Sequence, residues 1–293
     1  MLHASVFVPI PGTTALMHLS ASFITAIALS VACATLSVFV VSRRWAFIGE
    51  GISHSGFGGA GTAWLLALAL PGTVFEESWM PACGVVVFCL GTALAIGYMT
   101  RSRRISSDTA IGVFMVASLA WGFLARSLFR ALKGKEPMGF EALLFGDTRD
   151  VSGGFAAAAV LLCGAVVCAI VLLRKEILYY CFDAAMAEAS GVAARFIHYL
   201  LILLVSLTIV IGARVVGTVL VTALLVLPGA TALNLCRGLR GAIAGSLVTA
   251  LAGTLVGLTI SRHWAFIPTG PAMVLCLFAL FVLSLFWSRV RST

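Results

Sequence analysis

Long apolar runs separated by short polar connectors make up most of the chain. Each run is close to the roughly 20 residues that a helix needs to cross a bilayer. The runs cover residues 16–41, 46–70, 81–99, 109–129, 153–173, 196–212, 215–235, 241–260 and 271–288. This pattern predicts an all-α, polytopic transmembrane helical bundle of about eight or nine spans, because one run could be a half-span or a re-entrant piece.

The composition agrees with a membrane protein, since 61% of the residues are hydrophobic, 10% are charged and the mean hydropathy is +1.11. Such values lie far outside those of soluble domains. The net charge of +8 does not indicate a nucleic-acid partner, because the basic residues lie at the edges of the apolar runs. We expect one transmembrane domain over residues 1–293, surrounded by lipid.

The basic residues also predict an orientation, because cytoplasmic loops are enriched in Lys and Arg. The connectors at 42–45, 100–108, 174–195 and 236–240 are then cytoplasmic together with the C-terminus, and the N-terminus lies outside. The cations between residues 126 and 135 lie outside in this arrangement, against the trend.

Glu50 and His54 lie within the second apolar run, four residues apart. On a helix this spacing places both side chains on one face. Counting about 1.5 Å per residue from Arg44 puts His54 roughly 15 Å deep, near the middle of the hydrocarbon core. Ionisable groups at that depth usually line a polar path. A carboxylate and an imidazole suit Mn²⁺, Fe²⁺ or Zn²⁺, but two ligands do not complete a site.

The second run is rich in small side chains. Gly51, Ser55, Gly59 and Ala63 fall on one i, i+4 ridge, which predicts close approach of a neighbouring helix. Gly58 and Thr62 follow Glu50 and His54 on the adjacent ridge, so we expect room for an ion above the pair. From spacing alone, three roles stay open for the pair: metal passage, proton transfer and helix packing. The other histidines, at positions 3, 18, 198 and 263, lack partners at ligand spacing and are expected at the membrane interface.

The connector at 174–195 predicts a short surface helix. Asp183 can cap residues Ala184–Ala189, and Gly191 can end the helix. Such a helix suits docking to a partner, although an ordinary connector would have the same pattern. The chain contains no G-x-x-x-x-G-K-[ST] loop, so we do not expect it to be an enzyme that hydrolyses ATP; any ATP-driven activity needs a separate subunit.

Several motifs, in order along the chain, resemble those of the integral membrane permeases of manganese/zinc/iron ABC importers. They are SVFVVSRRWAFIGEGISH at 37–54, DTAIGVF at 108–114, LFGD at 144–147, Phe182-Asp183 with Ala187 and Gly191, VGTVLV at 216–221, LLVLPGATA at 224–232 and PTG at 268–270. His54 matches the family motif directly, whereas the family usually carries Asp at the position of Glu50. The metal preference of any relative is therefore not carried over.

The resemblance implies a permease of the type II importer kind in the bacterial cytoplasmic (inner) membrane, paired with a second permease copy or paralogue around a central path. It further implies two ATP-binding subunits on the cytoplasmic face and an extracytoplasmic protein that delivers the metal. In such permeases the loop at 182–192 forms the coupling helix, which assigns that role to Asp183, Ala187 and Gly191.

The sequence therefore predicts the permease subunit of an ATP-driven importer for Mn, Zn or Fe. The metal is its cargo, ATP binds the partner subunit, and no cofactor is held permanently. Two other functions remain open at this stage. One is a proton- or sodium-coupled secondary carrier that uses the same Glu50–His54 pair, and the other is a membrane scaffold that transports nothing.

Overall fold

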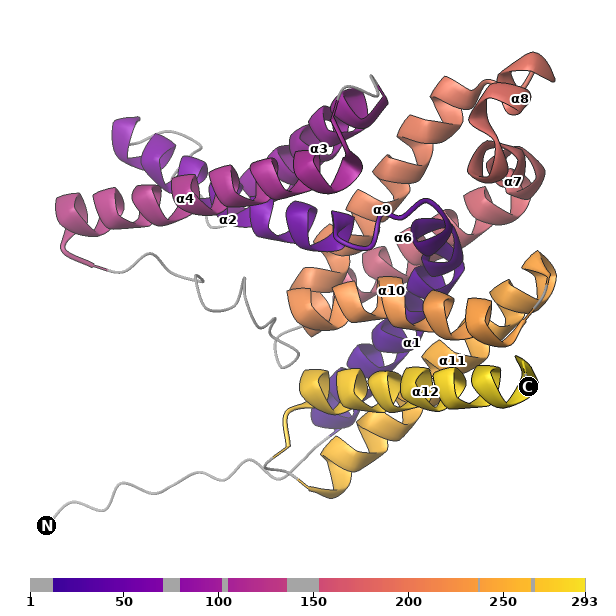
Figure 1. Ribbon diagram of the computed structural model, residues 1–293. Coiled ribbons are helices and arrows are strands. Elements are labelled where there is room, and N and C mark those ends of the chain that lie inside the picture. Colours follow the sequence, from indigo (N-terminus) through magenta and orange to yellow (C-terminus); the bar gives the residue numbers. More distant parts are fainter. Residues whose placement is uncertain are drawn as a thin grey trace, which may run out of the picture.

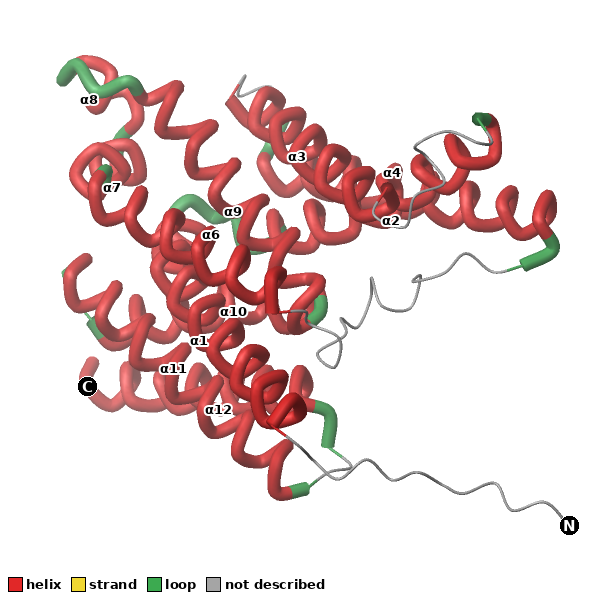
Figure 2. The backbone as a smooth tube through the Cα atoms, turned by 180° about the vertical axis from the view of Figure 1, so that it is seen from behind, coloured by secondary structure: helices red, strands yellow, loops and turns green. Residues whose placement is uncertain are grey.

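The structure, a computed structural model, describes residues 13–70, 80–101, 105–135, 153–236, 238–264 and 267–292. Within these ranges the regular elements are helices and none is a strand (Figures 1 and 2). The predicted all-α fold is therefore confirmed for this part of the chain. The motif at 144–147 and His3 lie outside the described residues.

Eight described helices are long and apolar enough to cross a membrane. They are α1 (Thr13–Ser42), α3 (Met80–Arg101), α4 (Ser107–Lys133), α6 (Gly153–Leu172), α9 (Ala194–Val216), α10 (Thr218–Leu235), α11 (Leu239–His263) and α12 (Thr269–Ser292). The remaining predicted run forms α2 (Ile48–Ala69), which is 22 residues long but rich in glycine. The range of eight or nine spans is unchanged.

Two short helices fill the connector at 174–195, where the pattern predicted only one. They are α7 (Arg174–Phe182) and α8 (Ala184–Ala189). The sequence did not reveal α7 because its first turn is charged and only Ile177 and Tyr180 are buried. Two buried positions are too few to form a recognisable helical period.

Three of the predicted cytoplasmic connectors meet at one end of the molecule. The Arg43 Nη2 group, in the α1–α2 turn, donates to the Tyr180 hydroxyl of α7 at 2.9 Å. At the end of α3, Arg101 lies 3.9 Å from Glu188 of α8. Figure 1 shows α7 and α8 beside the start of α9 at this end. These contacts confirm that the connectors share one face of the bundle.

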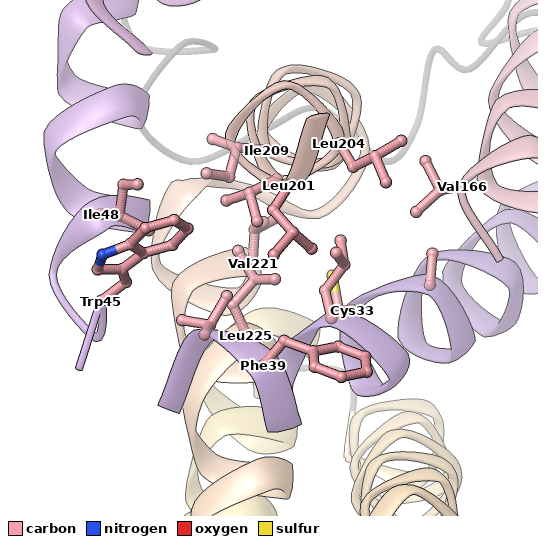
Figure 3. Packing of buried hydrophobic residues seen from close by; sticks show 14 of the residues in the cluster. Cys33, Phe39, Trp45, Ile48, Val166, Leu201, Leu204, Ile209, Val221 and Leu225 are labelled. Atoms are coloured by element: carbon pink, nitrogen blue, oxygen red, sulfur yellow. The ribbon is translucent and has the colours of Figure 1, made fainter. Parts of the chain in front are cut away.

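The main core forms where α1, α9 and α10 cross. Leu36, Leu201 and Ile209 are fully buried there, and Figure 3 shows side chains of α1, α2, α6, α9 and α10 filling the space between the helices. Among transmembrane helices, close packing rather than exclusion of water supplies most of the association energy. This core holds α10 beside the first turn of α2.

A tight turn separates α1 from α2. Arg44 adopts a left-handed conformation with φ of 58°, while its N–H donates to Val41 O and that of Trp45 to Val40 O. This is the hydrogen-bond pattern of a Schellman motif. Because α2 starts only at Ile48, His54 lies about 9 Å along the helix axis from that start. The residues between Arg44 and Ile48 therefore form a turn and not a helix, while the expected depth of about 15 Å, counted at 1.5 Å per residue from Arg44, stays a prediction.

Candidate metal-binding site on the transport path

Glu50 and His54 form the central contact of the candidate site. The Oε2 atom of Glu50 lies 2.9 Å from Nε2 of His54, which confirms that the two side chains share one face of α2. The side chains are 37% and 23% exposed, respectively. Glu50 lies in the first turn of α2, where unpaired N–H groups and the helix dipole stabilise a negative charge. The pair is therefore both accessible and electrostatically supported.

Thr222 of α10 completes the contacts of the carboxylate. Its hydroxyl lies 3.2 Å from Glu50 Oε1 and 3.0 Å from the carbonyl oxygen of Val219, so its single proton is shared between these two acceptors. The two helices come this close because Gly49 has no side chain: a Cβ there would lie 3.0 Å from Thr222 Cγ2. Sequence reasoning missed Thr222, which falls between the motifs at 216–221 and 224–232. The i, i+4 spacing within α2 carries no information about a hydroxyl on α10.

The imidazole of His54 retains an unused ring nitrogen. Its Nδ1 atom is buried and has no hydrogen-bond partner among the described residues. The ring is stacked on Phe57, with centroids 6.1 Å apart and planes inclined by 26°. If Nε2 carries the proton shared with Glu50, Nδ1 holds the free lone pair of a neutral imidazole. The contact with Glu50 thus uses Nε2 and leaves Nδ1 buried and unpaired among the described residues.

The ridge above the pair does not leave the room that the sequence predicted. A Cβ on Gly58 would lie 2.7 Å from the Phe88 ring of α3, and the Trp121 indole of α4 donates to Thr62 at 2.9 Å. Aromatic side chains from two neighbouring helices therefore occupy this space, which a pattern within one helix cannot show. The open side of the pair is the partly exposed carboxylate of Glu50.

The other predicted ridge does bring helices close together. On α2, Gly51 faces Ile111 of α4, and Gly59 lies against Gly84 of α3. A Cβ on Gly84 would lie 2.6 Å from the carbonyl oxygen of Gly59. The predicted close packing is confirmed, and it involves two neighbours instead of one.

A small hollow, partly open to the surface, lies beside the pair, between α2, α3, α9 and α10. Its lining includes Ser53, Cys89 and Arg214. The Arg214 guanidinium stacks over the Phe155 ring at 5.0 Å. A fixed positive charge in the lining makes the hollow unfavourable for a divalent cation.

No cluster of three or more His, Cys, Asp or Glu side chains suited to a metal ion occurs within the described residues. The Glu50–His54 pair thus offers two strong ligands, as the sequence indicated. Water, the Thr222 hydroxyl or a second subunit would have to supply the others. An incomplete ligand set of this kind suits transient binding better than a permanent structural site.

The short helix α8 has the ends that the sequence predicted. Asp183 Oδ1 accepts hydrogen bonds from the N–H groups of Ala185 and Met186 at 2.9 and 3.0 Å. Gly191 has a φ of 81°, and Val192 N–H donates to Ala187 O at 2.9 Å. Ala187 is fully buried, whereas Met186 is 61% exposed. One side of α8 is therefore packed against the protein, and its opposite side presents an exposed apolar side chain.

The expectation for His198 is wrong. His198 is 4% exposed and lies between the Tyr180 hydroxyl, at 2.6 Å, and the carbonyl oxygen of Gly97, at 2.9 Å. Its partners come from α7 and α3, so neither could be found from spacing along α9. His263 is exposed beside Trp264, as expected for an interface residue.

Comparison with known proteins places this arrangement in a family. The ABC 3 transport family matches residues 15–288. The chain belongs to this family. A protein of Haemophilus influenzae named "Probable iron transport system membrane protein" is 32% identical over 270 residues, which are 92% of this chain and 93% of that protein. The manganese transport system membrane protein MntC of Halalkalibacterium halodurans is 30% identical over 271 residues, 92% of this chain and 87% of its own length.

A solved structure agrees with the ABC 3 assignment. The chain aligns with PsaBC from Streptococcus pneumoniae, determined in complex with Fab, with a TM-score of 0.72 and 28% identity over 91% of this chain and 90% of that chain. The names of the ABC 3 relatives refer to iron, manganese and zinc. The resemblance to permeases of metal importers is thus confirmed, and the chain is a multi-pass membrane protein.

Proposed function

We propose that this chain is the permease subunit of an ATP-driven importer for Mn²⁺, Fe²⁺ or Zn²⁺ in the bacterial cytoplasmic membrane. The observation that carries the proposal is the partly exposed Glu50–His54 contact within a helical membrane domain of the ABC 3 family. Iron, manganese and zinc all accept mixed oxygen and nitrogen ligands. The replacement of the usual Asp by Glu50 leaves the choice among the three metals to experiment.

The Glu50–His54 pair acts as a transient ligand set on the path. A divalent ion between the two side chains displaces the proton that they share and is held by one carboxylate oxygen and one imidazole nitrogen. The hydroxyl of Thr222 keeps Glu50 oriented when the ion has left, because it donates to the other carboxylate oxygen. Weak coordination allows release, which a closed four-ligand site would prevent.

The energy comes from separate ATP-binding subunits, because this chain has no P-loop. We assign docking of those subunits to α8, whose local structure Asp183, Ala187 and Gly191 define. Exposed Phe182 and Met186 provide an apolar surface there that suits insertion into a groove of a partner. A second permease copy or a paralogue completes the path, and an extracytoplasmic binding protein delivers the ion.

Uptake by the complete transporter tests the proposal. Glu50→Gln and His54→Gln should each lower uptake of radioactive manganese, iron or zinc roughly tenfold or more, since each removes a direct ligand. His263→Gln serves as the control, because this exposed histidine lies away from the pair. Unchanged uptake in both pair variants would refute the role of the site. Uptake that survives ATP depletion but stops when the proton gradient collapses would indicate a secondary carrier instead.

A further inference from the structure

A largely buried polar network joins four elements at the end of the bundle where the predicted cytoplasmic connectors meet. Arg43, in the α1–α2 turn, donates through Nη2 to the Tyr180 hydroxyl at 2.9 Å and through Nη1 to the Tyr180 carbonyl at 3.4 Å. The hydroxyl contacts Nδ1 of His198 at 2.6 Å, and Nε2 of His198 contacts the Gly97 carbonyl oxygen at 2.9 Å. The chain of contacts runs from the start of α2 through α7 and α9 to α3.

With a neutral His198, only one arrangement of protons satisfies every contact of the network. A guanidinium can only donate and a carbonyl can only accept. The Gly97 carbonyl therefore requires a proton on Nε2 of His198, and a neutral imidazole then accepts at Nδ1. Tyr180 must donate to His198 and accept from Arg43. Burial raises the pKa of Tyr180 to about 12, although the Arg43 cation opposes this shift, so the hydroxyl keeps the proton that it donates.

Aromatic contacts pack around these hydrogen bonds. The Arg43 guanidinium lies over the Tyr180 ring, 4.4 Å from its centroid. The Trp45 ring meets His198 edge-on, with centroids 5.5 Å apart. Tyr180 is 4% exposed and Trp45 is 3% exposed. In such surroundings a lost hydrogen bond is not replaced by water, so movement of one member displaces the others.

The two ends of the network connect α8 to the metal pair. On one side, Asp183, which caps α8, donates its N–H to the Tyr179 carbonyl at 3.0 Å, next to Tyr180. On the other side, the Trp45 carbonyl accepts from Ile48 N–H, the first residue of α2, at 2.9 Å. Glu50 follows in the same turn of α2.

We propose that Arg43, Tyr180 and His198 are positioning residues that transmit displacement of α8 to the first turn of α2, and so control access to Glu50 and His54. The inference rests on the proposed function for its cargo and energy source. None of the three side chains touches the metal pair. If the network only held the helices together, its loss would lower the stability of the bundle. If it transmits motion, its loss also lowers the number of ions imported per ATP hydrolysed.

Tyr180→Phe is the decisive variant in the reconstituted transporter with its ATP-binding subunits and binding protein. The ring and its packing remain, but both hydroxyl hydrogen bonds disappear. ATP hydrolysis should stay within about twofold of the unmodified transporter, while metal ions imported per ATP fall roughly tenfold. Tyr179→Phe is the matched control, because this side chain on the same helix is 55% exposed. Equal import ratios in the two variants would overturn the proposal.

A double-mutant cycle shows whether the residues act through the same bond. His198→Gln keeps an N–H near the Nε2 position for the Gly97 carbonyl but has no acceptor atom at the Nδ1 position, where Tyr180 donates. If the bond transmits the motion, the double variant with Tyr180→Phe imports no less per ATP than Tyr180→Phe alone. If instead the import ratio of the double variant fell by the product of the two single losses, the two residues would not act through a shared bond. His198→Gln also tests this contact by itself if Tyr180→Phe accumulates poorly.

Hydrogen exchange separates this proposal from the identity of the cargo. ATP should alter amide exchange in residues 48–54 of the assembled transporter, and Tyr180→Phe should reduce that change severalfold. If residues 48–54 respond to ATP in this manner while no metal is imported, the proposed function fails and the network stands. If metal is imported but residues 48–54 do not respond to ATP, the network proposal fails alone.

Discussion

Replacing Gly59 by alanine tests the close packing that fixes α2. A Cβ on Gly59 would lie 2.7 Å from the carbonyl carbon of Gly84 and 2.8 Å from Phe88 Cβ. The carbonyl oxygen of Gly84 would lie closer still, and the nearest ordinary contacts are about 3.4 Å, so α2 and α3 must separate by more than 0.7 Å locally. The obstacle is backbone, which cannot rotate away as a flexible side chain can. Overpacking of this kind costs about 1–3 kcal/mol.

Thermal unfolding of the purified permease in detergent measures this cost. The midpoint for Gly59→Ala should fall by about 2–10 °C. Gly91→Ala in α3 is the matched control, since a Cβ there meets nothing within 4 Å and alanine favours a helix by about 1 kcal/mol. Its midpoint should stay constant or rise. Equal midpoints for the two variants would refute the contact between α2 and α3 as described.

Three further predictions concern the site, the surface helix and the turn before α2. Thr222→Val removes the donor to Glu50 and should lower metal uptake about tenfold. Thr231→Val should leave uptake unchanged, because among the described residues this hydroxyl bonds to the carbonyl of residue 227 in its own helix, as Thr222 also does to that of residue 219, but it has no contact with Glu50. Asp183→Ala removes the cap of α8, costs about 1 kcal/mol locally, and should reduce stimulation of the ATP-binding subunit by the permease; full stimulation would argue against docking through α8. Arg44→Val places a β-branched residue at positive φ, so its free energy of unfolding should be about 1–2 kcal/mol lower than that of Arg44→Asn. Arg44→Val should therefore unfold at a lower temperature, and equal unfolding temperatures would contradict the left-handed turn.

Local features of the candidate site follow from the sequence with little ambiguity. The i, i+4 spacing of Glu50 and His54 requires a shared face once the segment is helical. The ends of α8 follow from Asp183 and Gly191, because a short carboxylate side chain bonds free N–H groups and glycine tolerates positive φ. In each case, the interacting atoms lie within a few residues of one another in the chain.

Contacts between distant segments could not be predicted in this way. Thr222 reaches Glu50 only because Gly49 lets α10 approach α2. His198 has no partner on its own helix face, yet it is bound by Tyr180 and by the Gly97 carbonyl. Hydropathy determines which segments become helices, but it does not specify how those helices are rotated or which of them meet.

The sequence by itself determined a helical membrane protein, the order of its apolar segments, and one acidic and one imidazole ligand on a single helix face. Its motifs also indicated the transporter family. Only the tertiary structure decided where α2 begins, which aromatic side chains close the ridge above the pair, and which hydroxyl contacts its carboxylate. The physical reason is the sequence separation of the interacting groups. Helical periodicity relates residues within a turn or two, whereas these features depend on side chains from helices that are far apart in the chain.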